Sequence, residues 1–227
     1  MAAGRGTRLG PLTTDNPKTL VEISGRPILE YILSALLPLV TEAIVVVGYK
    51  GDRIQERFGL RFKNLSITYV KQRNLAGTAD ALWQVRSYLK PGKFLVLNGD
   101  DLYDTLDLRR CLEEELSMGL TQSIPMGPSY EVVGLDRHGY IENWRKVLPK
   151  ELFEKVVIIS GAYVLDHRIF NFEPVAISGK EYGLPHTILA MSKTHSVRGV
   201  IMKRWAPVNR PEDVAAAEIF LKQNRNL

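Results

Sequence analysis

The feature that most constrains the fold is a series of short apolar runs that alternate with segments of helical periodicity. Residues 43–47 (AIVVV) form a continuous, largely β-branched run that ends at Gly48, which is typical of a strand buried on both faces of a parallel sheet. Residues 66–72 and 93–97 predict two further strands, and the apolar spacing within residues 28–37 predicts an amphipathic helix before them. Strands that alternate with helices predict an α/β fold.

The second half of the sequence changes character. Residues 131–136 and 140–143 flank an Arg-His-Gly turn and predict a β-hairpin, and residues 156–165 predict a long strand that contains Gly161. The remaining helices are expected at residues 54–58, 80–89, 107–118 and 211–223. With no repeat, low-complexity tract or linker, we expect a single domain over residues 1–227.

Composition limits the class of partner and the compartment. The net charge of +5 comes from cations scattered along the 227 residues, so a nucleotide explains it as well as a nucleic acid does, and no basic tail favours DNA or RNA. Cys111 is the single cysteine, which excludes an internal disulfide, leaves a zinc cluster without ligands and indicates a cytoplasmic protein. The most apolar stretch, residues 28–40, is too short to span a bilayer, so we expect no membrane segment.

Residues 1–20 (MAAGRGTRLGPLTTDNPKTL) concentrate glycines, cations and prolines. Gly4 and Gly6 allow backbone N–H groups to approach an anion, and the positive charge comes from Arg5, Arg8 and Lys18. The stretch therefore predicts a polyphosphate site. A loop of this kind ordinarily follows a buried strand, whereas no apolar run precedes these glycines; without that strand, a central position in the sheet is expected to be empty.

Spacing excludes two common phosphate loops. A dinucleotide fingerprint needs a third glycine where Leu9 stands, and a Walker loop needs Gly-Lys-Ser/Thr where this sequence has Leu9, Gly10 and Pro11. A dinucleotide-dependent oxidoreductase is therefore the least favoured of the three functions that we consider for this sequence.

The pattern G-x-G-T-R-L-x-P-L-T followed by P-K-x-L resembles the signature of the sugar-1-phosphate nucleotidylyltransferases. The residues that carry it are Gly4, Gly6, Thr7, Arg8, Leu9, Pro11, Leu12, Thr13, Pro17, Lys18 and Leu20. The resemblance implies a Rossmann-like, mostly parallel mixed sheet flanked by helices, of the nucleotide-diphospho-sugar transferase type, with antiparallel additions in the second half. It also implies a nucleotide-binding half at about residues 1–120, a sugar-binding half at about 121–210 and a C-terminal helix at 211–223.

A second segment of resemblance lies at the end of the strand at residues 66–72. Gln72 stands five residues before Gly77-Thr78-Ala79, which is similar to the family's base-recognition segment. An amide can donate and accept at the edge of a pyrimidine, and a glycine leaves room for the base. The alternative is a plain strand-to-helix turn with Thr78 as the N-cap.

The strand at residues 93–97 delivers Asn98-Gly99-Asp100, which resembles the family's metal-binding turn. Ligands collect at the carboxyl ends of strands in open α/β sheets, so Asp100 is placed to hold a metal on the nucleotide phosphates, although Asp100 and Asp101 could instead cap or turn the chain. Relatives commonly have an aspartate where Pro207 stands. Asn209 could supply an oxygen ligand in its place, or it could be a plain loop residue.

The resemblance implies a reaction and a set of site residues. An oxygen of a sugar 1-phosphate attacks the α-phosphorus of a nucleoside triphosphate, UTP or dTTP being favoured, with Mg²⁺ as the cofactor. The implied roles are catalytic for Arg8, Lys18 and Asp100, nucleotide-binding for Ala3, Gly4, Gly6, Thr7, Gln72, Gly77 and Thr78, sugar-binding for Lys146, Gly161 and Glu181, and metal-binding for Asp100 and Asn209. The expected partners are these two substrates, with no nucleic acid and no membrane, and a homo-oligomer is left open.

The resemblance weakens after Asp101. Glu131 stands where relatives usually have glycine, Arg145 where they have glutamate, and His186 where an aspartate is common. Pro207, Arg145, Glu131 and the missing first strand support an alternative function, a catalytically weak nucleotide-sugar-binding regulatory or partner subunit with the same fold.

Overall fold

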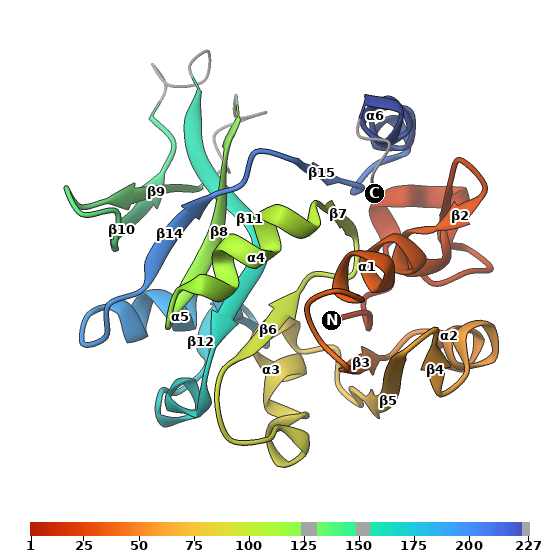
Figure 1. Cartoon of the computed structure of the whole chain (residues 1–227), viewed down its shortest axis with the longest axis horizontal. Coiled ribbons are helices and arrows are strands. Elements are labelled where there is room, and N and C mark those ends of the chain that lie inside the picture. Colours follow the sequence, from red (N-terminus) through yellow and green to blue (C-terminus); the bar gives the residue numbers. More distant parts are fainter. Residues whose placement is uncertain (124–130, 149–154, 224–227) are drawn as a thin grey trace.

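The predicted strand at residues 43–47 forms β3 (Glu42–Val47), which pairs in parallel with β5 (Leu65–Lys71) in the computed structural model (Figure 1). The structure describes residues 1–123, 131–148 and 155–223. Val45, Val46 and Val47 are all buried, and Val46 packs in a different apolar cluster from its two neighbours. Strand β3 is therefore buried on both faces, as predicted. A short strand, β4 (Arg61–Phe62), lies antiparallel on the other edge of β5.

A second sheet has the order β14-β8-β11-β6. Its strands are β6 (Phe94–Leu97), β8 (Ser117–Ser123), β11 (Val156–Leu165) and β14 (Arg198–Ile201). Strand β11 is antiparallel to both neighbours, and β14 is parallel to β8. The predicted α/β fold with antiparallel additions in the second half is confirmed.

Short antiparallel pairs complete the described β-structure. They are β1 (Glu22–Ile23) with β2 (Arg26–Pro27), β7 (Asp101–Tyr103) with β15 (Trp205–Pro207), β9 (Glu131–Leu135) with β10 (Ile141–Lys146), and β12 (Val175–Ser178) with β13 (Glu181–Gly183). The β9–β10 pair is the predicted hairpin. The β7–β15 pair joins segments about a hundred residues apart and brings β15 close to the end of β6.

Helices flank these sheets. They are α1 (Ile28–Leu36), α2 (Gly51–Phe58), α3 (Gly77–Trp83), α4 (Thr105–Glu113), α5 (Leu184–Ser192) and α6 (Pro211–Gln223), with 3₁₀ segments η1 (Thr7–Thr13), η2 (Lys18–Leu20), η3 (Arg86–Tyr88) and η5 (His167–Asn171). Helices α1, α2 and α6 lie where the sequence predicted them. In the part of the chain that the structure describes, no helix combines the length and the apolar composition needed to cross a membrane.

Two helix predictions were wrong in their extent. Helix α4 begins after the Asp104 N-cap, whose Oδ1 accepts from Leu106 N at 2.8 Å, and it ends at Glu113. The residues that follow, predicted to continue the helix, enter β8 because they pair with β11 on one edge and with β14 on the other. This pairing outweighs a weak local preference. The helix predicted at residues 80–89 ends at Trp83 and is followed by the 3₁₀ turn η3.

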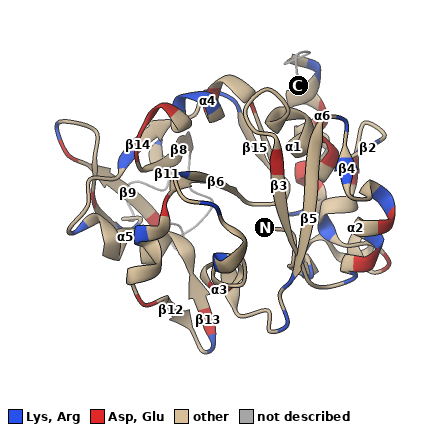
Figure 2. Ribbon diagram, turned by 60° about the horizontal axis from the view of Figure 1, so that its bottom comes forward, with Lys and Arg blue, Asp and Glu red and all other residues tan. Residues whose placement is uncertain are grey.

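Residues 1–3 lie between β3 and β6 and join the two sheets (Figure 2). Ala2 N donates to Val46 O at 2.7 Å, and the Met1 amino group donates to Leu97 O at 2.7 Å. Beside them is a cavity of about 470 Å³ that is lined largely by apolar residues of α1, β3 and β6. The described chain thus leaves much of the space between β3 and β6 unfilled.

Candidate functional site

A cavity of about 670 Å³ opens where residues 1–8, the end of β5, the end of β6 and the end of β15 meet. Its volume is within the range of about 300–1,000 Å³ that small-molecule sites usually have. The predicted site residues among its lining are Ala3, Gly4, Arg8, Lys18, Gln72, Gly77, Thr78, Asp100, Gly161, Glu181 and Asn209. The fold therefore gathers most of the residues that the sequence singled out, from segments spread over the whole chain.

Three of these side chains form one cluster. Lys18 Nζ donates to Asp100 Oδ2 at 2.6 Å and to Asn209 Oδ1 at 2.9 Å. The Lys18 side chain is 10% exposed and that of Asp100 is 30% exposed, so this ion pair is largely shielded from water. Asp100 directly follows the Asn-Gly turn after β6. Asn209 follows β15 and is held there because Val208 N donates to the main-chain oxygen of Asp100.

The geometry of this cluster fits the predicted magnesium site. One carboxylate oxygen and one amide oxygen converge on a single cationic atom, and hard oxygen donors of this kind suit Mg²⁺, which keeps several waters. Among the described residues, no group of three or more His, Cys, Asp or Glu side chains could hold a metal. A metal here would therefore have Asp100 and Asn209 as its protein ligands, and Lys18 Nζ would have to move aside.

A second carboxyl group lies beside the cluster and received little weight at the sequence level. Asp101 is buried in the cavity wall, and burial together with the charge of Asp100 raises its pKa well above the usual value. The hydroxyl of Tyr103 donates to Asp101 Oδ2 at 3.2 Å. The signal in the sequence is the pair of consecutive aspartates after Asn-Gly, because successive side chains of an extended segment point to opposite faces and only one of the two can be the more exposed.

The predicted base-recognition segment forms part of the wall of the cavity. Gln72 is buried, and its Nε2 donates to Gly77 O at 3.0 Å and to Asp80 Oδ2 at 2.7 Å. Both amide hydrogens are thus used within the protein, whereas the sequence predicted an amide that donates and accepts at the base. The atom that remains for a ligand is Oε1. Asp80, which sequence reasoning missed, controls this arrangement.

The neighbouring Gly77 and Thr78 also contact β13 and the start of α5. Gly77 has a φ of +92°, and a Cβ there would lie 2.3 Å from Tyr182 O, so β13 packs against one side of this glycine. Thr78 Oγ1 accepts from Leu184 N at 2.9 Å and so serves the start of α5. The N-cap of α3 is Ala76, and Thr78 is not that cap. Both residues still line the cavity.

Gly161 interrupts the pairing of β11 at the cavity wall. It has a φ of +77°, and a Cβ there would lie 2.3 Å from Asn98 Nδ2. The register between β11 and β8 shifts at this point. In the same cavity, Thr19 Oγ1 is buried without a hydrogen-bond partner in the described chain. Buried polar atoms are rarely left unpaired, so this atom marks a place where a ligand or water would bind.

Three of the predicted residues are not part of the cavity lining. Gly6 and Thr7 lie at the start of η1, behind the lining residues of the loop. Lys146 is exposed at the end of β10, so the structure does not bring it to the other predicted sugar-binding residues.

The departures from the family pattern contact one another in the second half of the chain. His186 Nε2 lies 3.5 Å from Glu131 Oε2, and its ring stacks on Trp144 with the centroids 4.7 Å apart. Glu131 and His186 therefore form one local contact between β9 and α5.

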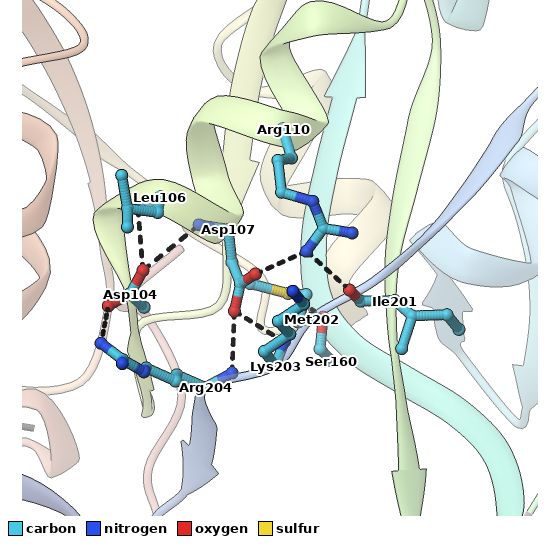
Figure 3. A network of polar contacts seen from close by, with 9 residues as sticks. All are labelled: Asp104, Leu106, Asp107, Arg110, Ser160, Ile201, Met202, Lys203 and Arg204. Atoms are coloured by element: carbon cyan, nitrogen blue, oxygen red, sulfur yellow. Dashed lines mark hydrogen bonds and ion pairs between the residues drawn. The ribbon is translucent and has the colours of Figure 1, made fainter. Parts of the chain in front are cut away.

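A polar network positions the segment that leads to Asn209 (Figure 3). Asp107 Oδ2 accepts from the backbone N–H groups of Lys203 and Arg204 at 2.7 and 2.8 Å, and its Oδ1 accepts from Arg110 Nη1 at 2.8 Å. These bonds tie the residues between β14 and β15 to the first turn of α4. The path of β15, and with it the approach of Asn209 to Asp100, depends on this carboxylate.

The fold and the site define an α/β protein with a cavity at the strand ends that is lined in part by the cations of Arg5, Arg8 and Lys18. Comparison with known proteins identifies the family. The model of the nucleotidyl transferase family matches residues 1–175, and the chain belongs to that family.

Individual relatives support this assignment. The chain is 30% identical over 230 residues to the bifunctional protein GlmU of Methanocaldococcus jannaschii, covering 100% of this chain and 54% of the relative. It is 30% identical over 175 residues to the D-glycero-alpha-D-manno-heptose 1-phosphate guanylyltransferase of Campylobacter jejuni, covering 75% of this chain and 76% of the relative. The chain spans about half the length of the GlmU relatives it matches.

A solved structure shows the same fold. The apo form of a UDP-glucose pyrophosphorylase superposes with a TM-score of 0.83 at 17% identity, covering 99% of this chain and 97% of the other. The Rossmann-like architecture expected from the sequence is therefore confirmed for this chain.

Proposed function

We propose that this chain transfers a nucleotidyl group from UTP or dTTP to a sugar 1-phosphate and releases pyrophosphate. The observation that carries the proposal is the convergence of Arg8, Lys18, Asp100 and Asn209 with Gln72 on one cavity. Cations, oxygen ligands and a hydrogen-bonding amide line this one cavity, which suits a ligand that carries both a polyphosphate and a base.

The chemistry requires positioning and charge neutralisation more than acid or base catalysis. An oxygen of the sugar phosphate forms a bond to the α-phosphorus as the bond from that phosphorus to the bridging oxygen of pyrophosphate breaks. Arg8, exposed at the mouth of the cavity, would hold the departing β- and γ-phosphates. The backbone at Ala3 and Gly4 would lie along the same phosphates.

Asp100 and Asn209 would hold Mg²⁺, which when bound neutralises phosphate charge and orients the triphosphate. In the ligand-free arrangement Lys18 neutralises Asp100 directly. We infer that Lys18 turns from these oxygens toward the α-phosphate and the incoming sugar phosphate when the substrates bind. Its flexible four-carbon stem permits this movement, since the two positions need differ by only a few bond rotations.

Gln72, whose Oε1 is the amide atom left for a ligand, is compatible with UTP and dTTP. Uracil and thymine each carry a ring N–H that such an acceptor can bind. The relatives leave the base open, because one of them is named a guanylyltransferase. For the acceptor, Glu181 and Gly161 line the cavity and would face the sugar, whereas Lys146 would have to approach from outside it.

The test is pyrophosphate release by purified protein with Mg²⁺, each of the four nucleoside triphosphates and dTTP, and a panel of sugar 1-phosphates. Release that needs both substrates and is lost in Asp100→Ala supports the proposal. Nucleotide binding without release for any pair would instead favour the regulatory or partner subunit, for which Pro207 and the contact between Glu131 and His186 would be the structural grounds.

A further inference from the structure

The orientation of the Gln72 amide is determined by its neighbours. Gly77 O and the Asp80 carboxylate can only accept hydrogen bonds, and both face the same end of the amide, at 3.0 and 2.7 Å. The alternative orientation would place Oε1 against two other oxygens. Nε2 must therefore point inward to α3, and both of its hydrogens are occupied.

The opposite end of the amide is available. Gln72 lines this cavity and also, together with Asp80, an adjoining hollow, and in the described part of the chain no hydrogen bond engages its Oε1. A base that reaches Gln72 from the cavity would therefore meet an acceptor. Uracil, thymine and guanine present a ring N–H on their Watson–Crick edge. Cytosine and adenine present an unprotonated ring nitrogen there, which would face Oε1 lone pair to lone pair.

We propose that Asp80 is a positioning residue for base specificity: it holds the Gln72 amide so that the site accepts bases with a ring N–H and rejects cytosine and adenine. The inference rests on the proposed function, in which Gln72 meets the base. Asp80 acts through Gln72 and not by contact with the base.

The placement of Asp80 supports this role. It lies in the first turn of α3, and from there its Oδ2 reaches the Gln72 amide at 2.7 Å. Its other oxygen, Oδ1, accepts from Gln84 Nε2 at 3.2 Å. The carboxylate is therefore held between two amides, one inside the cavity wall and one on the helix surface.

The experiment compares the wild type with Asp80→Asn and with Gln84→Ala. An asparagine at position 80 has nearly the same shape but can turn its own NH₂ toward Gln72. The reversed amide, which offers a donor to cytosine, is then opposed by the one remaining oxygen, Gly77 O, instead of by two. Gln84→Ala is the matched control, because it removes the other partner of the same carboxylate and leaves Gln72 untouched. UTP and CTP binding is measured by titration calorimetry, and kcat/KM is measured for both nucleotides.

In Asp80→Asn we expect the preference for UTP over CTP, as the ratio of the two affinities and of the two kcat/KM values, to fall about tenfold, because a hydrogen bond to a charged group is replaced. CTP should bind more tightly than it does to the wild type. Gln84→Ala should keep the wild-type ratio. Equal losses for UTP and CTP in Asp80→Asn, or an unchanged ratio, would overturn the inference while leaving the proposed function intact. A folded wild type that binds neither nucleotide and releases no pyrophosphate would overturn the proposed function and the inference together.

Discussion

The Asp107 carboxylate offers the sharpest test of how the fold supports the site. Its side chain is 4% exposed, and it accepts two backbone N–H groups from the segment before β15 (Figure 3). Asp107→Ala leaves both N–H groups without this acceptor. Hydrogen bonds to a charged group contribute about 1.5–3 kcal/mol each, and relief from burying the carboxylate offsets part of the loss, so we expect the free energy of unfolding to fall by about 3 kcal/mol.

A loss of this size corresponds to a decrease in Tm of about 6–12 °C for a chain of this length. Urea and thermal unfolding followed by circular dichroism would measure both quantities. Asp107→Asn should lose less, because the remaining side-chain oxygen can still accept from the backbone of Lys203 and Arg204. The matched control is Arg110→Ala, which removes the ion pair but keeps both backbone bonds. Since the Arg110 side chain is 40% exposed, we expect that control to lose less than about 1 kcal/mol.

The reasoning is refuted if Asp107→Ala and Arg110→Ala lose the same stability, or if Asp107→Ala loses less than about 1 kcal/mol. Asp107→Ala should also weaken the binding of Mn²⁺, which is used here as a substitute for Mg²⁺ and measured by calorimetry. The reason is that β15 then no longer holds Asn209 beside Asp100. Unchanged Mn²⁺ affinity in a destabilised variant would separate the stability of this segment from the geometry of the site.

Three further predictions follow from individual contacts. Lys18→Met should tighten Mn²⁺ binding about tenfold by calorimetry, because no ammonium must leave Asp100 and Asn209, while pyrophosphate release falls about a hundredfold; weaker Mn²⁺ binding would contradict it. Gly161→Ala should lower the free energy of unfolding in urea by about 3 kcal/mol, whereas Gly92→Ala should lower it by about 1 kcal/mol, because Gly92 has a positive φ but open space around it. Equal losses would show that the contact with Asn98 is unimportant. The Cys111 thiol, whose pKa is raised to about 12 by burial, should not react with a disulfide reagent at pH 8 until urea unfolds the chain, and rapid labelling of the native protein would refute this.

Local patterns in the sequence predicted the elements whose formation depends on local chemistry. The β-branched run of β3, the spacing of α1 and the proline and acidic residues at the start of α6 were sufficient. Strand β8 was not predicted, because Ser-Met-Gly-Leu-Thr-Gln-Ser has little strand preference of its own and becomes a strand through pairing with β11 and β14. The short strands β7 and β15 also exist only through each other.

The candidate site also combines residues that the sequence pattern predicted with contacts that only the fold creates. The motif residues Lys18, Asp100 and Asn209 could be named from the sequence, but their contact joins positions up to 191 residues apart. Their roles in catalysis stay predictions. Asp80 carried no signal, because an aspartate in the first turn of a helix is ordinary until a buried amide is found beside it. Lys146 was named from its place in a pattern, and the path of β10 leaves it outside the cavity.

By itself, the sequence determined the α/β class, the family motif of residues 1–20 and the identity of the residues that carry charge, because these depend on composition and on spacing within short segments. Only the tertiary structure decided which charges neutralise one another and which atoms remain for a ligand. Lys18 faces two oxygens, both amide hydrogens of Gln72 are bound within the protein and β13 packs against Gly77. The physical reason is that a hydrogen bond is set by the position and direction of two groups, and here those groups come from segments that the fold alone brings together.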